Sequence, residues 1–420
     1  MKSQFNSLFS KLKKHHIILE NFGYLGIIEI FNLVIPLMTY PYLIRTLGKD
    51  TFGLVIYAQA IVSYLVIIVS FGFSMSATKQ VSLYRNDQKK LNEIVSTVLF
   101  IKGILFLLTA LILVVVLFLL PQAIGHKILF VYTLWMCLYD FIFPVWFYQG
   151  IEKMKYITLL TLTSRLIFLV LIFVIIQSPS DYLKVPLING IGSLTAGIIS
   201  LYIVLSKFNI KLRFPSLSSI KFHLKDSYSL FLSDLIIAIK DKSNYLLIGA
   251  IIGHGAVTEF DLALKIKGVF SIPIDLINKA LYPKISKERN MIFMQKSMWL
   301  TFILTTGITI LAFLFARPIT NLLGGGGMKD IVQITRILLV SIPPFTLSYF
   351  LAVNCINAHG RYFLLLKGMI YTTGFYVFFI IFGYVSGNLK SLYFYAICAV
   401  LTYVFELFYR VYIIRKNNLI

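Results

Sequence analysis

Charged side chains lie inside long apolar stretches of this sequence, where they are energetically costly. Nine of them are basic: Lys102, Arg165, Lys240, Lys242, Lys265, Lys267, Lys279, Arg336 and Lys367. Seven are acidic: Glu29, Asp140, Asp234, Asp241, Asp261, Asp275 and Glu406. An ionised side chain at the middle of a bilayer costs ~2.5–3.5 kcal/mol, so each must pair, face water or the protein interior, or reach a membrane surface. A water-filled cavity with surplus positive charge is what an anionic substrate requires.

The depth and spacing of these charges separate two groups. Four bases lie within a few residues of a stretch end, where snorkelling to lipid headgroups explains them: Lys102, Lys279, Arg336 and Lys367. Asp261 and Lys265 are four residues apart, as are Asp275 and Lys279, which is the favourable spacing for helical ion pairs. Whether these pairs only neutralise each other is left open. Lys267 has no acid three or four residues away.

Lys240 and Lys242 flank Asp241 in the sequence. Two residues along a helix correspond to a rotation of about 200° around its axis. Both ammonium groups therefore cannot share the direction of Asp241, and at least one of them needs another partner.

The elements that carry these charges are apolar and of membrane-spanning length. Hydrophobic residues make up 58% of the 420 residues and charged residues only 13%. A bilayer core needs about 20 apolar residues per helix. The sequence predicts twelve such spans, at 24–44, 52–73, 95–120, 128–149, 156–177, 185–206, 228–252, 257–282, 297–316, 331–355, 362–385 and 391–412.

Basic residues outside the spans alternate between the two sides of the membrane. Twenty-three Lys and Arg lie in the N-terminal segment, the even-numbered gaps and the C-terminal tail. The odd-numbered gaps hold seven: Arg45, Lys49, Lys127, Lys184, Arg317, Lys329 and Lys390. The positive-inside rule therefore predicts that both termini are cytoplasmic. The same alternation attributes the net charge of +22 to topology, and nucleic-acid binding is not expected.

Twelve spans divide into two sets of six in the same orientation, which predicts an internal duplication. Gly48, Ala58 and Lys79 recur 205 residues later as Gly253, Ala263 and Lys284. We therefore predict an all-α polytopic membrane protein with two six-helix lobes, residues 1–210 and 211–420, around a central cavity. This architecture is typical of a transporter. Prolines within the spans mark sites where helices can kink: Pro36, Pro41, Pro144, Pro273, Pro343 and Pro344.

Several short motifs resemble a known family over essentially the whole chain. Asn32–Leu37, Pro41–Gly48 and Phe52–Leu54 are similar to the start of the O-antigen or polysaccharide-unit flippases. The pattern continues at later positions, namely Phe71–Phe73, Ser76–Lys79, Trp146–Gly150 and Leu281–Ser286. The motifs are individually loose, and their order and spacing carry the resemblance. It implies the fold of the multidrug/oligosaccharidyl-lipid/polysaccharide exporter superfamily, with alternating access.

The resemblance also implies a substrate and a location. The substrate would be an undecaprenyl-diphosphate-linked oligosaccharide, moved from the cytoplasmic to the periplasmic leaflet of the bacterial inner membrane, with its lipid tail between spans 1 and 8. By this analogy, diphosphate or acidic sugars would bind five bases: Arg165, Lys240, Lys242, Lys265 and Lys267. A coupling proton would be taken up by Asp140, Asp241 or Asp261, and Na⁺ is the alternative coupling ion. Trp135 and Tyr245 are candidates for stacking on sugar rings.

Other classes fit the sequence less well. A multidrug and toxin extruder of the same fold is the nearest alternative, although its cationic substrates favour acidic cavities. A peptidoglycan-precursor flippase usually has additional spans. The longest extracytoplasmic loop has roughly fifteen residues, too short for a glycosyltransferase or polymerase site. No Walker A motif is present, and the loop 79–93 lacks the signature of the major facilitators.

We therefore expect a secondary transporter rather than an enzyme, without cofactor or metal centre. The three cysteines all lie in spans, which disfavours disulfides. Membrane lipids are its expected surroundings, a monomer its expected state, and a polysaccharide polymerase a compatible partner.

Overall fold

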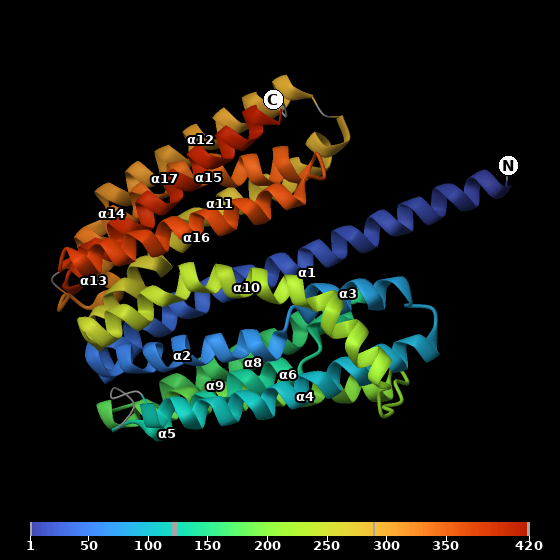
Figure 1. The fold of residues 1–420 in the computed structure, drawn as a ribbon, viewed down its shortest axis with the longest axis horizontal. Coiled ribbons are helices and arrows are strands. Elements are labelled where there is room, and N and C mark those ends of the chain that lie inside the picture. Colours follow the sequence, from blue (N-terminus) through green and yellow to red (C-terminus); the bar gives the residue numbers. More distant parts are fainter. Residues whose placement is uncertain (1, 120–124, 289, 329, 418–420) are drawn as a thin grey trace. The chain divides into compact units, whose positions relative to one another are not determined.

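The computed structural model describes residues 2–119, 125–288, 290–328 and 330–417. Within these ranges the chain forms helices and short connections and contains no strand, which confirms the predicted all-α class (Figure 1). The chain divides into two compact units. Unit 1 comprises Met1–Thr39 and Ala58–Leu235, and unit 2 comprises Tyr40–Tyr57 and Ile236–Ile420.

Three helices contribute residues to both units: α1 (Lys2–Leu47), α2 (Lys49–Ser70) and α10 (Leu217–Ile251). The remaining helices of unit 1 are α3 (Phe73–Leu83), α4 (Gln88–Leu119), α5 (Lys127–Thr133), α6 (Trp135–Ile142), α7 (Val145–Gly150), α8 (Met154–Ile175), the short η2 (Pro179–Leu183) and α9 (Lys184–Ser206). The division into lobes at residue 210 stays a prediction.

The core of unit 1 lies where α3, α4 and α7 meet. Phe73, Phe147 and Tyr148 are fully buried there. The Tyr148 hydroxyl donates to the carbonyl of Ser200 on α9 at 2.8 Å, so the buried phenol is satisfied. A Cβ at Gly150 would lie 2.6 Å from Val81 on α3, and only glycine allows the two helices to approach this closely.

The predicted span at 128–149 is not one continuous helix. It consists of α5, α6 and α7, with a break between Ile142 and Val145. Pro144 lies in this break. Because proline has no N–H to donate, it interrupts the helical hydrogen bonds there. This confirms the kink predicted there.

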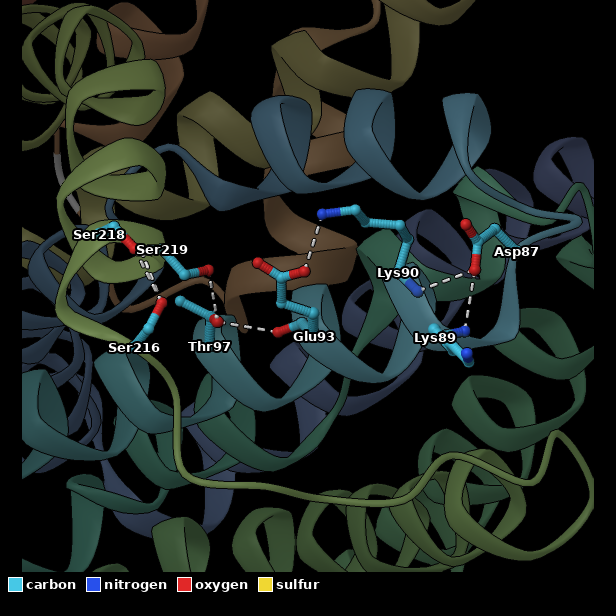
Figure 2. Close-up of polar contacts among 8 residues, drawn as sticks. All are labelled: Asp87, Lys89, Lys90, Glu93, Thr97, Ser216, Ser218 and Ser219. Carbon is cyan, nitrogen blue, oxygen red and sulfur yellow. Dashed lines mark hydrogen bonds and ion pairs between the residues drawn. The ribbon is translucent and has the colours of Figure 1, made fainter.

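The connection that follows α9 is held against α4 on the side that the charge count assigns to the cytoplasm. Asp87 caps α4 by accepting hydrogen bonds from the backbone N–H groups of Lys89 and Lys90 (Figure 2). At the start of α10, the Ser219 hydroxyl pairs with Thr97 of α4 at 3.0 Å. The contact between Ser219 and Thr97 ties the start of α10, which carries several of the charged candidates, to α4.

Unit 2 is built from α11 and the helices that pack around it. They are α11 (His254–Glu288), α12 (Met291–Leu314), α13 (Ala316–Gly324), α14 (Ile331–Val340), α15 (Ile342–Phe350), the π-helical η3 (Leu351–Asn357), α16 (Tyr362–Val385), the short η4 (Asn388–Lys390) and α17 (Leu392–Lys416).

Prolines in unit 2 have two different effects. Pro343 and Pro344 lie in the first turn of α15, directly after the break at Ser341, as the predicted kink requires. Pro273, in contrast, lies inside the continuous helix α11. In unit 2, Pro343 and Pro344 therefore divide the predicted span at 331–355, whereas Pro273 leaves the predicted span at 257–282 as one continuous helix.

Ten helical segments of the described chain are long and apolar enough to cross a membrane, which makes the protein a multi-pass membrane protein. The predicted spans on α10 and α11 are not among them. Both helices have 35 residues but carry too many charges, such as Lys240, Asp241 and Lys242, to meet that criterion. The full count of twelve spans and the cytoplasmic termini stay predictions.

Candidate functional site

The most deeply buried basic candidate is Lys267 on α11. It is 7% exposed, and no carboxylate of the described residues lies within 4.0 Å of its ammonium group. Instead Nζ lies 4.0 Å from the ring centroid of Tyr403 on α17 and 5.8 Å from that of Phe345 on α15. Aromatic faces attract a cation without neutralising it. Lys267 therefore has aromatic rings rather than a carboxylate as its nearest charge-binding partners among the described residues of unit 2.

Lys240 on α10 approaches the same aromatic ring. Its Nζ lies 5.7 Å from the Tyr403 centroid and 3.9 Å from Asp241 Oδ1, at the limit of an ion pair. A small cavity of about 60 Å³ adjoins both lysines. Its lining includes seven polar residues, namely Lys240, Asp241, Asn244, Lys267, Tyr376, Thr402 and Tyr403. The structure thus brings together two of the predicted substrate-binding bases and one predicted coupling acid.

Asp261 is buried, and two phenols hold it. Tyr40 on α1 donates to Oδ2 at 2.5 Å, and Tyr245 on α10 donates to Oδ1 at 2.8 Å. The interpretation of Asp261 and Lys265 as an ion pair is therefore wrong. Two neutral donors satisfy the carboxylate, while the Lys265 ammonium lies 5.9 Å from the Tyr40 ring centroid. The Asp261 carboxylate joins three helices of unit 2.

The second pair predicted on α11 is confirmed. Lys279 and Asp275 form an ion pair, and Asp275 also accepts a hydrogen bond from the Tyr349 hydroxyl at 2.9 Å. Its spacing is the same as that of Asp261 and Lys265, so the neighbouring helices decided which pair formed.

Two further bases of unit 2 are exposed. Lys265 and Lys242 both lie on the surface, and the Lys242 ammonium is 5.9 Å from the ring centroid of Tyr245. A charged side chain on the surface of a spanning helix faces water or protein rather than lipid. The ring of Tyr245, predicted to stack on sugars, makes an edge contact with Phe260.

In unit 1, Asp140 is paired. Lys102 on α4 lies 2.9 Å from Asp140 Oδ2 and also donates to the Asp140 carbonyl at 2.6 Å. Lys102 is 3% exposed, so its predicted snorkelling to the membrane surface is wrong. An acid on α6, one helix away in the bundle, provides a partner that sequence spacing does not reveal.

Arg165 and Trp135 are the other candidates of unit 1. Arg165 on α8 is half-buried and forms no ion pair within the described chain. Trp135 packs closely on Gly190 of α9. A Cβ at Gly190 would lie 3.0 Å from the Trp135 ring. Its close packing on Gly190 gives this residue a structural role.

Sequence reasoning missed the tyrosines that organise this site. Tyr40, Tyr403 and Tyr376 contact Asp261, Lys267 and Asn244, respectively. The chain contains 25 tyrosines, and nothing in their spacing separates these three from the others. A further buried pair, Arg410 with Glu406, has the four-residue spacing that could have revealed it.

Long helices with buried charges define a class of protein: a multi-pass membrane transporter. Residues 18–289 match the family described as polysaccharide biosynthesis protein, and the chain belongs to this family. A relative named "Putative O-antigen transporter" in Escherichia coli (strain K12) is 28% identical over 335 residues, covering 78% of this chain and 80% of that protein. A relative of the same name in Shigella dysenteriae is 28% identical over 267 residues, covering 61% and 64%.

Solved structures share the fold. The lipid II flippase MurJ, in an inward closed conformation, matches with a TM-score of 0.71 at 13% identity, over 93% of this chain and 87% of that chain. An inward-facing multidrug resistance transporter of the MATE family matches with a TM-score of 0.68 at 15% identity, over 92% and 99%. These matches confirm the superfamily fold predicted from the sequence.

Proposed function

We propose that the protein is a flippase for a lipid-linked oligosaccharide in the bacterial inner membrane. Its cargo is an undecaprenyl-diphosphate-linked O-antigen or capsule repeat unit, moved from the cytoplasmic to the periplasmic leaflet by alternating access. The observation that carries this proposal is Lys267, a buried lysine that has no carboxylate within 4.0 Å among the residues that the structure describes. Family membership and the names of the two relatives support the choice of cargo.

The charges of unit 2 suit a diphosphate. Lys242 and Lys265 are exposed and can contact phosphate oxygens directly. Lys240 and Lys267 line the small cavity and add positive potential in a region of low dielectric constant, where charge interactions are strong. In unit 1, Arg165 is the candidate for an additional contact with the anionic headgroup.

A proton or Na⁺ drives the cycle in this proposal. Asp261 is the best suited of the three candidate acids, because two phenols hold its carboxylate and, among the described residues, it forms no ion pair with a lysine. Asp241 has Lys240 at 3.9 Å, at the limit of an ion pair. Asp140 already forms an ion pair with Lys102, which makes it the least suited.

Deletion of the gene tests this function. The expected result is accumulation of the lipid-linked repeat unit on the cytoplasmic leaflet and loss of surface polysaccharide, both reversed by the wild-type gene. A double variant, Lys240→Ala with Lys267→Ala, should not restore the polymer. The control Lys287→Ala, which replaces an exposed lysine of α11, should restore it. Drug sensitivity with intact glycans would instead indicate a multidrug extruder.

A further inference from the structure

A second polar site lies in unit 2, and none of its lining residues belongs to the cavity beside Lys240 and Lys267. A cavity of about 520 Å³ opens among residues from the start of α2, the connection between α10 and α11, the segment before α14, and the start of α17. Pockets for small ligands typically have about 300–1,000 Å³. All four segments lie in or directly beside gaps that the charge count assigns to the extracytoplasmic side.

Two cross-links hold the walls of this cavity. The Lys49 ammonium pairs with Glu259 Oε1 at 3.1 Å, which joins α2 to α11. The Tyr393 hydroxyl donates to Asp330 Oδ1 at 2.7 Å, which joins α17 to the segment before α14. Glu259 is 5% exposed and also accepts a hydrogen bond from the backbone of Asp330. The polar groups of the cavity are therefore fixed in place before any ligand binds.

The lining combines acceptors, donors and an aromatic ring. Three carboxylates line it, from Asp50, Glu259 and Asp330, against two ammonium groups, from Lys49 and Lys390. A surplus of one negative charge disfavours a phosphate. Sugar hydroxyls, in contrast, both donate and accept hydrogen bonds and carry no charge, and the face of Tyr393 offers an apolar surface to a sugar ring.

We propose that this cavity binds the glycan part of the cargo on the extracytoplasmic side. This inference rests on the proposed function and extends it: the lysines around Tyr403 bind the diphosphate, and the acidic cavity binds sugars. The two parts of one amphiphilic substrate are recognised by two sites of opposite charge within the same unit. Asp50, whose carboxylate lies over Gly255, is the principal acceptor for a sugar hydroxyl.

Cysteine protection tests the site directly. The three native cysteines are buried, so a membrane-impermeant maleimide should label the variant Ser391→Cys selectively at the cavity. The probe is the free oligosaccharide that mild acid releases from the lipid-linked precursor of the source strain. It should slow labelling of Ser391→Cys but not of the control Asn388→Cys, which is exposed in η4 outside the lining. Inorganic pyrophosphate should slow neither.

A charge variant separates binding from nonspecific shielding. Asp50→Asn, introduced together with Ser391→Cys, should raise the oligosaccharide concentration needed for protection by about tenfold, the loss expected for a hydrogen bond to a charged group. The matched control Asp181→Asn, the same change in unit 1, should leave that concentration unchanged. Saturation-transfer NMR on the wild-type protein in nanodiscs, with the same oligosaccharide, repeats the test without cysteine substitution.

The outcomes distinguish the two proposals. Equal labelling rates with and without oligosaccharide, or protection that Asp50→Asn does not weaken, overturn the glycan site. Labelling of Ser391→Cys only from the cytoplasmic side overturns it as well. Gene deletion without accumulation of the lipid-linked intermediate overturns the flippase function itself, whatever the labelling shows.

Discussion

The ammonium group of Lys267 on α11 lies 4.0 Å from the ring centroid of Tyr403 on α17. The aromatic ring takes the place that a carboxylate would occupy in an ordinary buried ion pair. A carboxylate would cancel the charge, whereas the ring stabilises the ammonium by roughly 2 kcal/mol when desolvated and leaves its field in place. An uncancelled cation in the membrane is what a transporter of phosphorylated lipids requires.

Removing the charge of Lys267 should abolish transport without harming the fold. We expect Lys267→Met to lower surface polysaccharide by at least about tenfold in a complemented deletion strain, since a charged contact of 1.4 kcal/mol or more is lost. Membrane abundance should stay normal, because the change leaves no carboxylate unpaired. Lys287→Met is the matched control on the same helix. Normal polymer in the Lys267 variant would remove this residue from the mechanism.

Substitutions of Tyr403 should separate its ring from its hydroxyl. Tyr403→Phe keeps an aromatic face beside the ammonium group and should support nearly normal transport. Tyr403→Leu removes the face and leaves Lys267 with Phe345 alone at 5.8 Å, so transport and thermal stability should both fall. Polymer levels and melting temperature in detergent give the comparison. Equal behaviour of the two variants would argue against a cation–π role.

Neutralising Asp261 should uncouple transport from the ion gradient. Asp261→Asn keeps the size of the side chain. Its amide oxygen can still accept from one of the two tyrosines and its NH2 group can donate to the hydroxyl of the other, but it cannot take up a proton. We expect the purified variant to bind lipid-linked oligosaccharide normally while an imposed proton or Na⁺ gradient no longer accelerates its movement. Glu288→Gln, at the end of the same helix, is the control. Gradient-driven transport by Asp261→Asn would exclude this carboxylate as the coupling site.

The pair of Lys102 and Asp140 should behave as a structural element. Lys102→Met leaves the half-buried Asp140 carboxylate without its cation, and breaking a fully buried pair typically costs about 3–5 kcal/mol, which is the upper limit here. Adding Asp140→Asn should recover most of this loss, because both charges are then absent. Melting temperatures of the single and double variants, with Trp135 and Trp146 of unit 1 as fluorescence reporters, test the coupling. Independent effects of the two substitutions would contradict it.

Sequence reasoning predicted the helical class, because it depends on composition and local spacing. It also predicted the break at Pro144, where a missing N–H has a local effect. It failed for Asp261, whose partner Tyr40 is 221 residues away. Spacing along one helix suggested Lys265 instead, but contacts between helices depend on how the bundle packs. Lys102 was misjudged for the same reason.

The cavity near Lys49 was equally invisible in the sequence. Its carboxylates come from Asp50 and Asp330, in two gaps between predicted spans, and from Glu259, at the start of a predicted span. None of these acids stands out when it is considered alone. Only the fold brings them to one place.

Reconstitution tests the central claim most directly. Purified protein is inserted into vesicles that contain undecaprenyl-diphosphate-linked oligosaccharide in both leaflets, and an added glycosidase reports which glycans reach the outside. We predict that wild-type protein makes the inner-leaflet pool accessible to the enzyme, whereas Lys267→Met leaves it protected. An inner pool that stays equally protected with wild-type protein and in protein-free vesicles, with and without an ion gradient, would contradict the account.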